Sequence, residues 1–316
     1  MSAIILRRRK LGRATEHVAE KMQQECKVVR NWVSSDWRGT GGVADPLVVF
    51  RWGCTSSLTG LADSSVTTVV NTAASIHWCS NKRQGRLDMQ TAGVPVPVTY
   101  DPRVILASFT DGHEGDFQEA AQAAGIDKKW VLRPSSHSQG KNLLYGTMAE
   151  LDENLHALYV GDRRLYNEFL DGYMSELIDK KAEYRVLVCQ NRVVWVAQKT
   201  PGNPDDVAWN VALGGRFDNV RWGEWPLQVV RAALAAAKVS KTDFCGVDVM
   251  VDAEDKPYVL EVNSAPSQTS PYRQQCLAKA FDYIVLNGKK HFDDVEDNGR
   301  KTWKSYIHPA VRNDDE

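Results

Sequence analysis

The chain has 316 residues, 43% hydrophobic and 25% charged, a composition typical of ordinary globular proteins and not of disordered or fibrous ones. Its 39 lysines and arginines nearly balance its 40 aspartates and glutamates, so the net charge of -1 gives no overall case for binding nucleic acid or anionic membranes, and any anion site must be local. The short apolar start, the lack of a membrane-length apolar run and six cysteines without CxxC pairs predict a cytoplasmic protein with free thiols, without zinc or disulfides.

Strand and helix patterns alternate in the first third of the chain. They lie at residues 4–6 (strand), 13–27 (helix, with Thr15 as N-cap), 45–53 (buried strand) and 82–91 (helix). The second helix is expected to stop near Gly93, and the pair Pro95 and Pro97 follows at once. This proline pair predicts the end of an N-terminal α/β domain, residues 1–97.

The middle of the chain continues the alternation and predicts a central subdomain, residues 98–170. Its strand patterns lie at residues 104–109, 130–133 and 165–170, and its helix pattern at residues 116–124. Residues 135–142 form a small, polar loop centred on Gly140, as needed for backbone N–H groups to close over a triphosphate. The loop is not a P-loop, because Ser135 stands where that motif needs glycine.

The last part of the chain predicts a further subdomain, residues 171–287, and a charged tail, residues 288–316. The expected elements are two strands over residues 183–198 that turn at Gln190 and Asn191, and an alanine-rich helix over residues 226–239. The tail is mostly charged with few apolar anchors, so we expect it to be weakly packed.

Residues 246–251 and 258–262 are strand-like runs on either side of a polar turn, which predicts an antiparallel hairpin. A centred turn places Asp248 directly opposite Glu261. Alternation of side chains then puts both carboxylates and Asn263 on one face. Opposed carboxylates repel unless a cation or a proton lies between them, and oxygen ligands suit Mg²⁺ or Mn²⁺.

The same register makes two further predictions for the hairpin. It pairs Met250 with Val259. It also assigns five residues to the core-facing side, namely Val247, Val249, Val251, Leu260 and Val262. The alternative to a metal site is a hairpin whose outer face is simply polar, and the choice between them depends on the surrounding motifs.

Residues 243–266, DFCGVDVMVDAEDKPYVLEVNSAP, closely resemble the end of the ATP-grasp domain. In that family a strand aspartate and a later Glu-x-Asn hold magnesium, and the resemblance implies these roles for Asp248, Glu261 and Asn263. Residues 73–100 are similar to the segment that leads into the ATP-grasp fold of RimK-type amino-acid ligases, with Lys82 and the proline pair in place.

Further segments resemble this family in the same order along the chain. Residues 130–145 look like the strand and phosphate-covering loop, residues 167–170 like the hinge strand whose backbone binds adenine, and residues 183–185, 198–199 and 210–216 like the ribose, phosphate and substrate segments. The implied cofactor-binding residues are Arg133, His137, Ser138, Gln139, Gly140, Lys141, Glu168, Phe169, Leu170, Glu183 and Asn210. The implied catalytic residues are Arg185, Lys199 and Arg216. Arg133 stands where the family usually has lysine.

The resemblance implies an α/β (α+β) ATP-grasp fold with an N-terminal pre-ATP-grasp α/β domain. The implied activity is that of a carboxylate–amine ligase that uses ATP and Mg²⁺ (or Mn²⁺) to form an acyl phosphate and then an amide. Its partners would be small-molecule or peptide carboxylates and amines, and a homo-oligomer is an open outcome, because such ligases are often dimers or tetramers. Two alternatives stay open: an ATP-grasp kinase, and a silent nucleotide-binding module, which would have no need of two opposed carboxylates.

Overall fold

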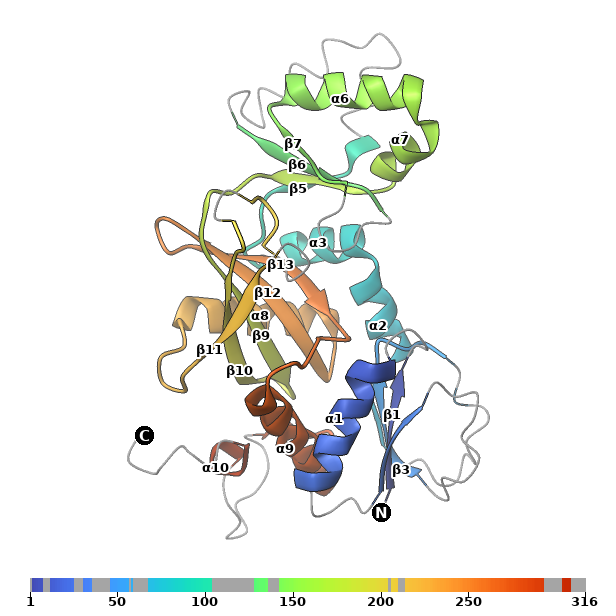
Figure 1. Ribbon diagram of the computed structural model, residues 1–316, viewed down its shortest axis with the longest axis vertical. Coiled ribbons are helices and arrows are strands. Elements are labelled where there is room, and N and C mark those ends of the chain that lie inside the picture. Colours follow the sequence, from blue (N-terminus) through green and yellow to red (C-terminus); the bar gives the residue numbers. More distant parts are fainter. Residues whose placement is uncertain are drawn as a thin grey trace.

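The computed structural model contains three β-sheets with helices packed on them (Figure 1). It describes residues 2–7, 12–25, 31–35, 46–56, 58, 68–103, 128–135, 142–203, 206–209, 214–292 and 303–307. The strand expected at residues 104–109 and the helix expected at residues 116–124 lie outside these residues. Within the described parts, none of the helices is long and apolar enough to cross a membrane.

The N-terminal sheet is fully parallel (Figure 1). Its strands in spatial order are β2 (Asn31–Ser35), β1 (Ser2–Arg7), β3 (Pro46–Trp52) and β4 (Thr68–Val70). The sequence predicted β1 and β3 correctly, because buried parallel strands read as continuous apolar runs. Helix α1 (Gly12–Glu25) confirms the predicted helix, but Thr15 as its N-cap is wrong, since the helix begins three residues earlier.

Two consecutive helices connect this sheet to the rest of the chain (Figure 1). Helix α2 (Ala73–Ser80) begins at Thr72, whose hydroxyl accepts from the backbone N–H of Ser75 in a capping box. Helix α3 (Lys82–Thr91) has the predicted bounds. Gly93 follows it at φ +72°, a left-handed conformation that glycine adopts without steric cost.

The central sheet is antiparallel and carries two helices (Figure 1). Its strands in spatial order are β5 (Thr99–Tyr100), β8 (Tyr173–Glu176), β6 (Trp130–Arg133) and β7 (Leu144–Gly146). Helices α6 (Met148–Gly161) and α7 (Arg163–Leu170) pack against it through a cluster that includes Trp130, Leu155 and Phe169. Strand β6 was predicted at the same residues.

The strand predicted at residues 165–170 is wrong, because this segment forms α7. Its N-cap is Asp162, whose carboxylate accepts from the N–H of Leu165 at 3.0 Å. Tyr166 and Phe169, three residues apart, are buried on one face of the helix. The strand that the sequence placed here is β8, which begins just after Gly172.

The C-terminal sheet is antiparallel and has five strands (Figure 1). They are, in spatial order, β11 (Arg216–Val220), β10 (Arg192–Thr200), β9 (Lys180–Cys189), β12 (Phe244–Asp252) and β13 (Pro257–Asn263). The predicted turn between β9 and β10 is confirmed: Gln190 and Asn191 have φ of +45° and +60°, as a tight hairpin turn requires. Helix α8 (Leu227–Ser240), also predicted, covers one face of this sheet through small alanines.

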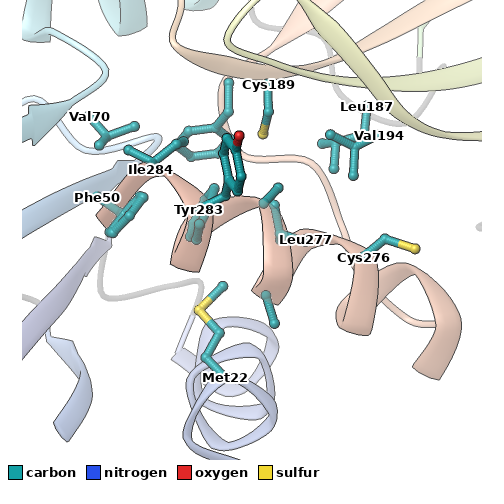
Figure 2. Close-up of a cluster of buried hydrophobic side chains, with 14 of the residues drawn as sticks. Met22, Phe50, Val70, Leu187, Cys189, Val194, Cys276, Leu277, Tyr283 and Ile284 are labelled. Carbon is teal, nitrogen blue, oxygen red and sulfur yellow. The ribbon is translucent and has the colours of Figure 1, made fainter. Parts of the chain in front are cut away.

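The opposite face of this sheet is divided between a core and a polar region. One half of this face carries Trp195 and Phe244, both fully buried, and packs against α9 (Pro271–Asn287) and the N-terminal sheet. Figure 2 shows Phe50 of β3 and Met22 of α1 meeting α9 in this core. The rings of Phe50 and Phe281 stack with centroids 4.0 Å apart. The other half of the same face carries polar side chains, among them Arg185 and Lys199.

The expectation of a weakly packed tail is wrong for its described part. Helix α10 (Trp303–Ile307) packs on α9, and Trp303, Ile307 and Phe292 are buried in the core that joins the sheets. Three apolar residues in a charged stretch suffice because each fills a site against α9.

Candidate active site

The polar half of the C-terminal sheet forms one wall of a cleft of about 400 Å³, and the central sheet and α3 form the others. Among the described residues, six cationic side chains line the cleft, namely Lys82, Arg86, Arg133, Lys180, Arg185 and Lys199. Four carboxylates also line it, namely Glu176, Glu183, Asp248 and Glu261. Over its described lining, the cleft is therefore more positive than the chain as a whole, which has a net charge of -1.

The predicted hairpin is present, and Asp248 of β12 lies directly opposite Glu261 of β13 as predicted. Asn263 faces the same cleft. The predicted pairing of Met250 with Val259 is wrong, because the register shifts after Asp248 and Met250 pairs with Tyr258.

This shift is a β-bulge, and it changes which side chains reach the cleft. Val259 turns into the core with no exposed surface, whereas Leu260, which we expected on the core face, lines the cleft. The carbonyl of Leu260 accepts a hydrogen bond of 2.6 Å from Nε of Arg86. Strict alternation therefore holds for Asp248, Glu261 and Asn263 and fails between these residues and the turn.

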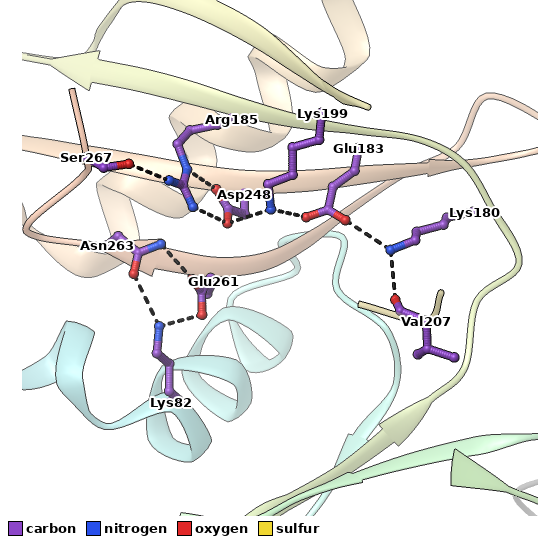
Figure 3. A network of polar contacts seen from close by, with 10 residues as sticks. All are labelled: Lys82, Lys180, Glu183, Arg185, Lys199, Val207, Asp248, Glu261, Asn263 and Ser267. Atoms are coloured by element: carbon purple, nitrogen blue, oxygen red, sulfur yellow. Dashed lines mark hydrogen bonds and ion pairs between the residues drawn. The ribbon is translucent and has the colours of Figure 1, made fainter. Parts of the chain in front are cut away.

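Asp248 is 4% exposed and lies between two cations (Figure 3). Arg185, its cross-strand neighbour on β9, donates from Nε and Nη2 to the two carboxylate oxygens at 2.7 and 2.8 Å. Nζ of Lys199 donates to the same carboxylate at 3.2 Å. Burial opposes ionisation of Asp248, but these two cations outweigh it and hold the pKa of the carboxyl below its usual value.

Glu261 is held by a different cation (Figure 3). Nζ of Lys82 lies 2.5 Å from its Oε2 and 3.3 Å from Oδ1 of Asn263, and Nδ2 of Asn263 donates to Oε1 of Glu261 at 2.7 Å. Burial opposes ionisation of this carboxyl too, yet the ammonium of Lys82 keeps its pKa well below the usual range. The opposed carboxylates needed a neighbouring positive charge, as the sequence argument required, and here lysine and arginine side chains supply it.

The donor atoms of Asp248, Glu261 and Asn263 suit a hard divalent cation, because all are carboxylate or amide oxygens. No group of three histidine, cysteine, aspartate or glutamate side chains with metal-binding geometry occurs among the described residues. The third oxygen of this set comes from asparagine. The position of the Lys82 ammonium, between Glu261 and Asn263, shows that a cation fits there with two oxygen neighbours.

A line of charges extends from Asp248 along the cleft (Figure 3). Lys199 is also paired with Glu183, which is 3% exposed, and Glu183 accepts from Lys180 at 3.1 Å. Nζ of Lys180 donates to the carbonyl of Val207 at 2.8 Å and lies 4.4 Å from the ring centre of Trp209. Glu183, Arg185 and Lys199, all predicted site residues, are therefore brought together.

Three buried N–H donors on the cleft wall have no hydrogen-bond acceptor in the part of the chain that the structure describes. They are Nη1 of Arg86, Nε of Arg133 and Nε1 of Trp209. Buried donors without a partner are costly, and all three belong to side chains that line this cleft, so a ligand with acceptor oxygens would suit them. Among them, only Arg133 was predicted.

Other predicted residues lie elsewhere. Glu168, Phe169 and Leu170 belong to α7 and do not line the cleft, so their assignment to an adenine-binding hinge strand is wrong. Arg216 is exposed at the start of β11, where it pairs with Asp218 at 3.0 Å. His137, Ser138, Gln139, Gly140, Lys141 and Asn210 lie outside the described residues.

Sequence reasoning missed several residues of the cleft. Leu177 and Ile178, which follow β8, line the cleft, whereas the sequence had assigned this role to a hinge strand at residues 167–170. Arg86 is four residues after Lys82, so the predicted helix already placed the two on one face. For Lys180 and Trp209 we find no comparable signal in the sequence.

Residues 104–280, more than half of the chain, match the family model of the RimK-like ATP-grasp domain. The chain belongs to the RimK-like ATP-grasp family. No curated protein sequence matches it.

Solved structures of this fold resemble the chain over most of its length. A D-alanine–D-alanine ligase from Bacillus anthracis is 15% identical, with a TM-score of 0.60 over 90% of this chain and 95% of that one. The macrocyclase MdnC from Microcystis aeruginosa, bound with the precursor peptide MdnA, is 13% identical, with a TM-score of 0.57 over 91% and 100%. The ATP-grasp ligase PsnB with a minimal precursor is 15% identical, with a TM-score of 0.54 over 84% and 91%. At these identities the likeness establishes the ATP-grasp fold.

Proposed function

We propose that this protein is an ATP-dependent carboxylate–amine ligase that forms an amide bond and releases ADP and phosphate. The observation that carries the proposal is the pair Asp248 and Glu261, opposed on neighbouring strands with Asn263 on the same cleft, in a chain of the RimK-like ATP-grasp family. Two similar structures are named as ligases and one as a macrocyclase with a precursor peptide, which supports ligation as the reaction and a peptide or small molecule as substrate.

The proposed metal is Mg²⁺ or Mn²⁺, held by the oxygens of Asp248, Glu261 and Asn263. When bound, a divalent ion at this position supplies positive charge that neutralises the phosphate oxygens of the nucleotide. The ligand set is rigid on one side, because Arg185 fixes Asp248 through two hydrogen bonds.

The proposed nucleotide site lies along the same cleft. Arg133, Arg86 and Trp209 offer unused N–H donors to phosphate and ribose oxygens. The backbone of Leu177 and Ile178 replaces residues 167–170 as the proposed adenine contact. Further proposed contacts, from the resemblance alone, are Glu183, His137, Ser138, Gln139, Gly140, Lys141 and Asn210.

In the proposed reaction a substrate carboxylate oxygen attacks the γ-phosphorus of ATP, and the bond to the ADP oxygen breaks. An amine nitrogen then attacks the carbonyl carbon of the acyl phosphate, and phosphate leaves with the electrons of the broken C–O bond. Arg185 and Lys199 hold positive charge beside the sheet where the phosphoryl group is transferred. The chain supplies binding, orientation and charge, and no protein nucleophile takes part.

Three finer statements belong to this proposal. The proposed division into units keeps its boundaries at residues 97, 170 and 287, although β8 (Tyr173–Glu176), which follows residue 170, pairs within the central sheet. The proposed partners are small-molecule or peptide carboxylates and amines. The proposed location is the cytoplasm, as the amino-acid usage predicts.

The deciding experiment measures ADP and phosphate release with Mg²⁺, ATP and pools of amino acids, small peptides and polyamines. Wild type should release both products in a substrate-dependent manner, and Glu261→Gln should lower the rate about 100-fold or more. The matched control is Glu254→Gln, a carboxylate exposed in the turn of the same hairpin, which should retain the wild-type rate. A substrate labelled with ¹⁸O in its carboxylate should transfer ¹⁸O to phosphate; a phosphorylated product without free phosphate would replace the ligase with a kinase.

A further inference from the structure

The two carboxylates of the proposed metal site are neutralised in different ways. Asp248 is held by two cations, Arg185 and Lys199, whose side chains are only 14% and 8% exposed and which lie on the same sheet. Among the described residues, Glu261 forms its ion pair with Lys82, whose ammonium sits on a flexible side chain that is 24% exposed, and it also accepts a hydrogen bond from Asn263. The cations paired with Asp248 are therefore fixed by the sheet, whereas the cation paired with Glu261 comes from another element, α3.

The backbone of Lys82 is held in place by its helix. Lys82 is the first residue of α3, and the preceding Asn81 caps that helix by accepting from the N–H of Gln84 at 3.1 Å. One turn later, Arg86 ties α3 to β13 through the carbonyl of Leu260. The fold thus aims the Lys82 side chain at Glu261 (Figure 3).

The position of this lysine is costly without a counter-ion, because the N-terminus of a helix carries partial positive charge. Glu261 and Asn263 compensate by offering two oxygens to the ammonium. Those are the oxygens that a divalent ion would need. An ammonium 2.5 Å from Oε2 of Glu261 and a metal ion bound to that oxygen between the same two side chains exclude each other.

We propose that Lys82 is an internal counter-ion that occupies the cation position between Glu261 and Asn263 until a metal–nucleotide complex displaces it. This inference rests on the proposed function, since it assumes that the cleft binds a metal nucleotide. A divalent ion alone must break the Lys82 pair and gains only protein oxygens. A metal nucleotide brings phosphate oxygens, which coordinate the ion and offer the displaced ammonium a new partner. Divalent-ion binding is therefore weak until nucleotide is present.

The arrangement protects the cleft from binding free divalent ions and makes the order of binding depend on one lysine. A purely structural role for Lys82, holding α3 against β13, predicts something else. In that case removing the ammonium would lower the stability of the protein and leave its affinity for divalent ions unchanged or reduced. The two roles are therefore separated by a binding measurement that does not involve catalysis.

The test measures Mn²⁺ binding to the full chain, by the loss of the free-Mn²⁺ electron paramagnetic resonance signal, with and without ADP, and the loss that ADP causes in the absence of protein is subtracted. Lys82→Met should bind Mn²⁺ at least 10-fold more tightly than wild type in the absence of ADP, and the gain from adding ADP should shrink. Lys82→Arg, which keeps the charge, should stay close to wild type. Lys181→Met, which removes an exposed lysine paired with Asp255, is the matched control and should change nothing.

A second variant assigns any gain to this site. Adding Glu261→Gln to Lys82→Met should remove the extra Mn²⁺ affinity, and circular dichroism should show that both variants are folded. Equal Mn²⁺ affinity of wild type and Lys82→Met without ADP, in proteins that bind Mn²⁺ with ADP, would overturn the role of Lys82. Failure of wild type and Lys82→Met alike to bind Mn²⁺ even with ADP would instead overturn the metal–nucleotide site, and with it the proposed function.

Discussion

The guanidinium of Arg86 donates through Nε to the backbone carbonyl of Leu260, and this bond satisfies a carbonyl at the bulge beside the proposed metal ligand Glu261. Arg86 is 2% exposed and its guanidinium carbon lies 5.6 Å from the centre of the Tyr173 ring. Its Nη1 faces no acceptor among the described residues. One buried side chain therefore links α3, β13 and the central sheet.

Arg86→Lys should weaken ADP binding by about 10- to 100-fold, because hydrogen bonds to charged groups contribute about 1.5–3 kcal/mol and lysine lacks the planar fork that serves two acceptors at once. Binding of AMP, with fewer phosphate oxygens, should weaken less. Isothermal titration calorimetry checks both affinities. Arg83→Lys on the same helix, whose partner is Asp101, is the control, and unchanged ADP affinity in Arg86→Lys would exclude a contact with the nucleotide.

Gly172→Ala should lower the stability by roughly 3 kcal/mol and also weaken nucleotide binding. A Cβ at this position would lie 1.8 Å from the backbone oxygen of Arg133, so β6 and the guanidinium it carries must shift. The matched control is Gly161→Ala at the end of α6, where a Cβ meets nothing within 4 Å and helix propensity slightly favours alanine. Urea unfolding and ADP titration compare the stability and the ADP affinity of the two variants. Equal effects of Gly172→Ala and Gly161→Ala would contradict the prediction.

Asp248→Asn should destabilise the protein by about 3–5 kcal/mol near pH 7, because it leaves the charges of Arg185 and Lys199 uncompensated in a buried site. In wild type the pKa of Asp248 is lower when folded than the ~4 of an unfolded chain. Its contribution to stability is therefore complete above about pH 5 and lost as the pH falls through the folded pKa. The carboxylate of Glu261, directly opposite on β13, acts against this lowering of the Asp248 pKa, but burial and Glu261 together are outweighed by the two cations.

Urea midpoints measured between pH 3 and pH 8 check this dependence. The wild-type midpoint should stay level from about pH 8 to pH 5 and fall below that, and the fall should be smaller in Asp248→Asn. Asp255→Asn, in the exposed turn of the hairpin, should follow the wild-type curve. Parallel acid profiles for wild type and Asp248→Asn would show that this carboxylate does not govern acid stability.

Asn71→Ala should lower the free energy of unfolding by roughly 3 kcal/mol, because Asn71 connects the end of the N-terminal sheet to the start of β12 in the C-terminal sheet. Asn71 is fully buried, and its side chain donates to the carbonyl of Phe244 at 2.9 Å and accepts from the N–H groups of Asp243 and Phe244 at 2.7 and 3.1 Å. Truncation leaves these backbone groups buried and unpaired. The control is Asn154→Ala, an exposed position on α6 whose side chain donates to the carbonyl of Glu150, and its loss of thermal stability should be much smaller. Similar losses in the two variants would show that Asn71 does not connect the two sheets.

Local patterns in the sequence were sufficient for elements whose signals lie within a few residues. The hairpin at Gln190 and Asn191 and the opposition of Asp248 and Glu261 follow from turn chemistry and alternation, and both are confirmed. A bulge breaks alternation, however, and this one is accompanied by a hydrogen bond from Arg86, 174 residues earlier. No window around Leu260 contains that information.

The adenine-hinge error has a similar cause. The segment Asn167–Leu170 resembles a strand motif, but the N-cap at Asp162 and the burial of Tyr166 and Phe169 on one face make it helical. The pairing of the cleft charges was equally hidden, because Lys82 meets Glu261 from a different element of the fold. Burial of the tail through Trp303 depends likewise on a site that α9 provides.

The C-terminal sheet uses a single face for two purposes, with charged residues such as Arg185 and Lys199 towards one end of its strands and Trp195 towards the other. Any attempt to build a chimera by exchanging the N-terminal unit must therefore supply a surface that fits Trp195, Phe244 and α9 as well as a new substrate wall. A donor unit with a poor fit would loosen the strands that position the charged side chains of the proposed active site. Transplanting specificity in this fold is thus a problem of core packing before it is one of recognition.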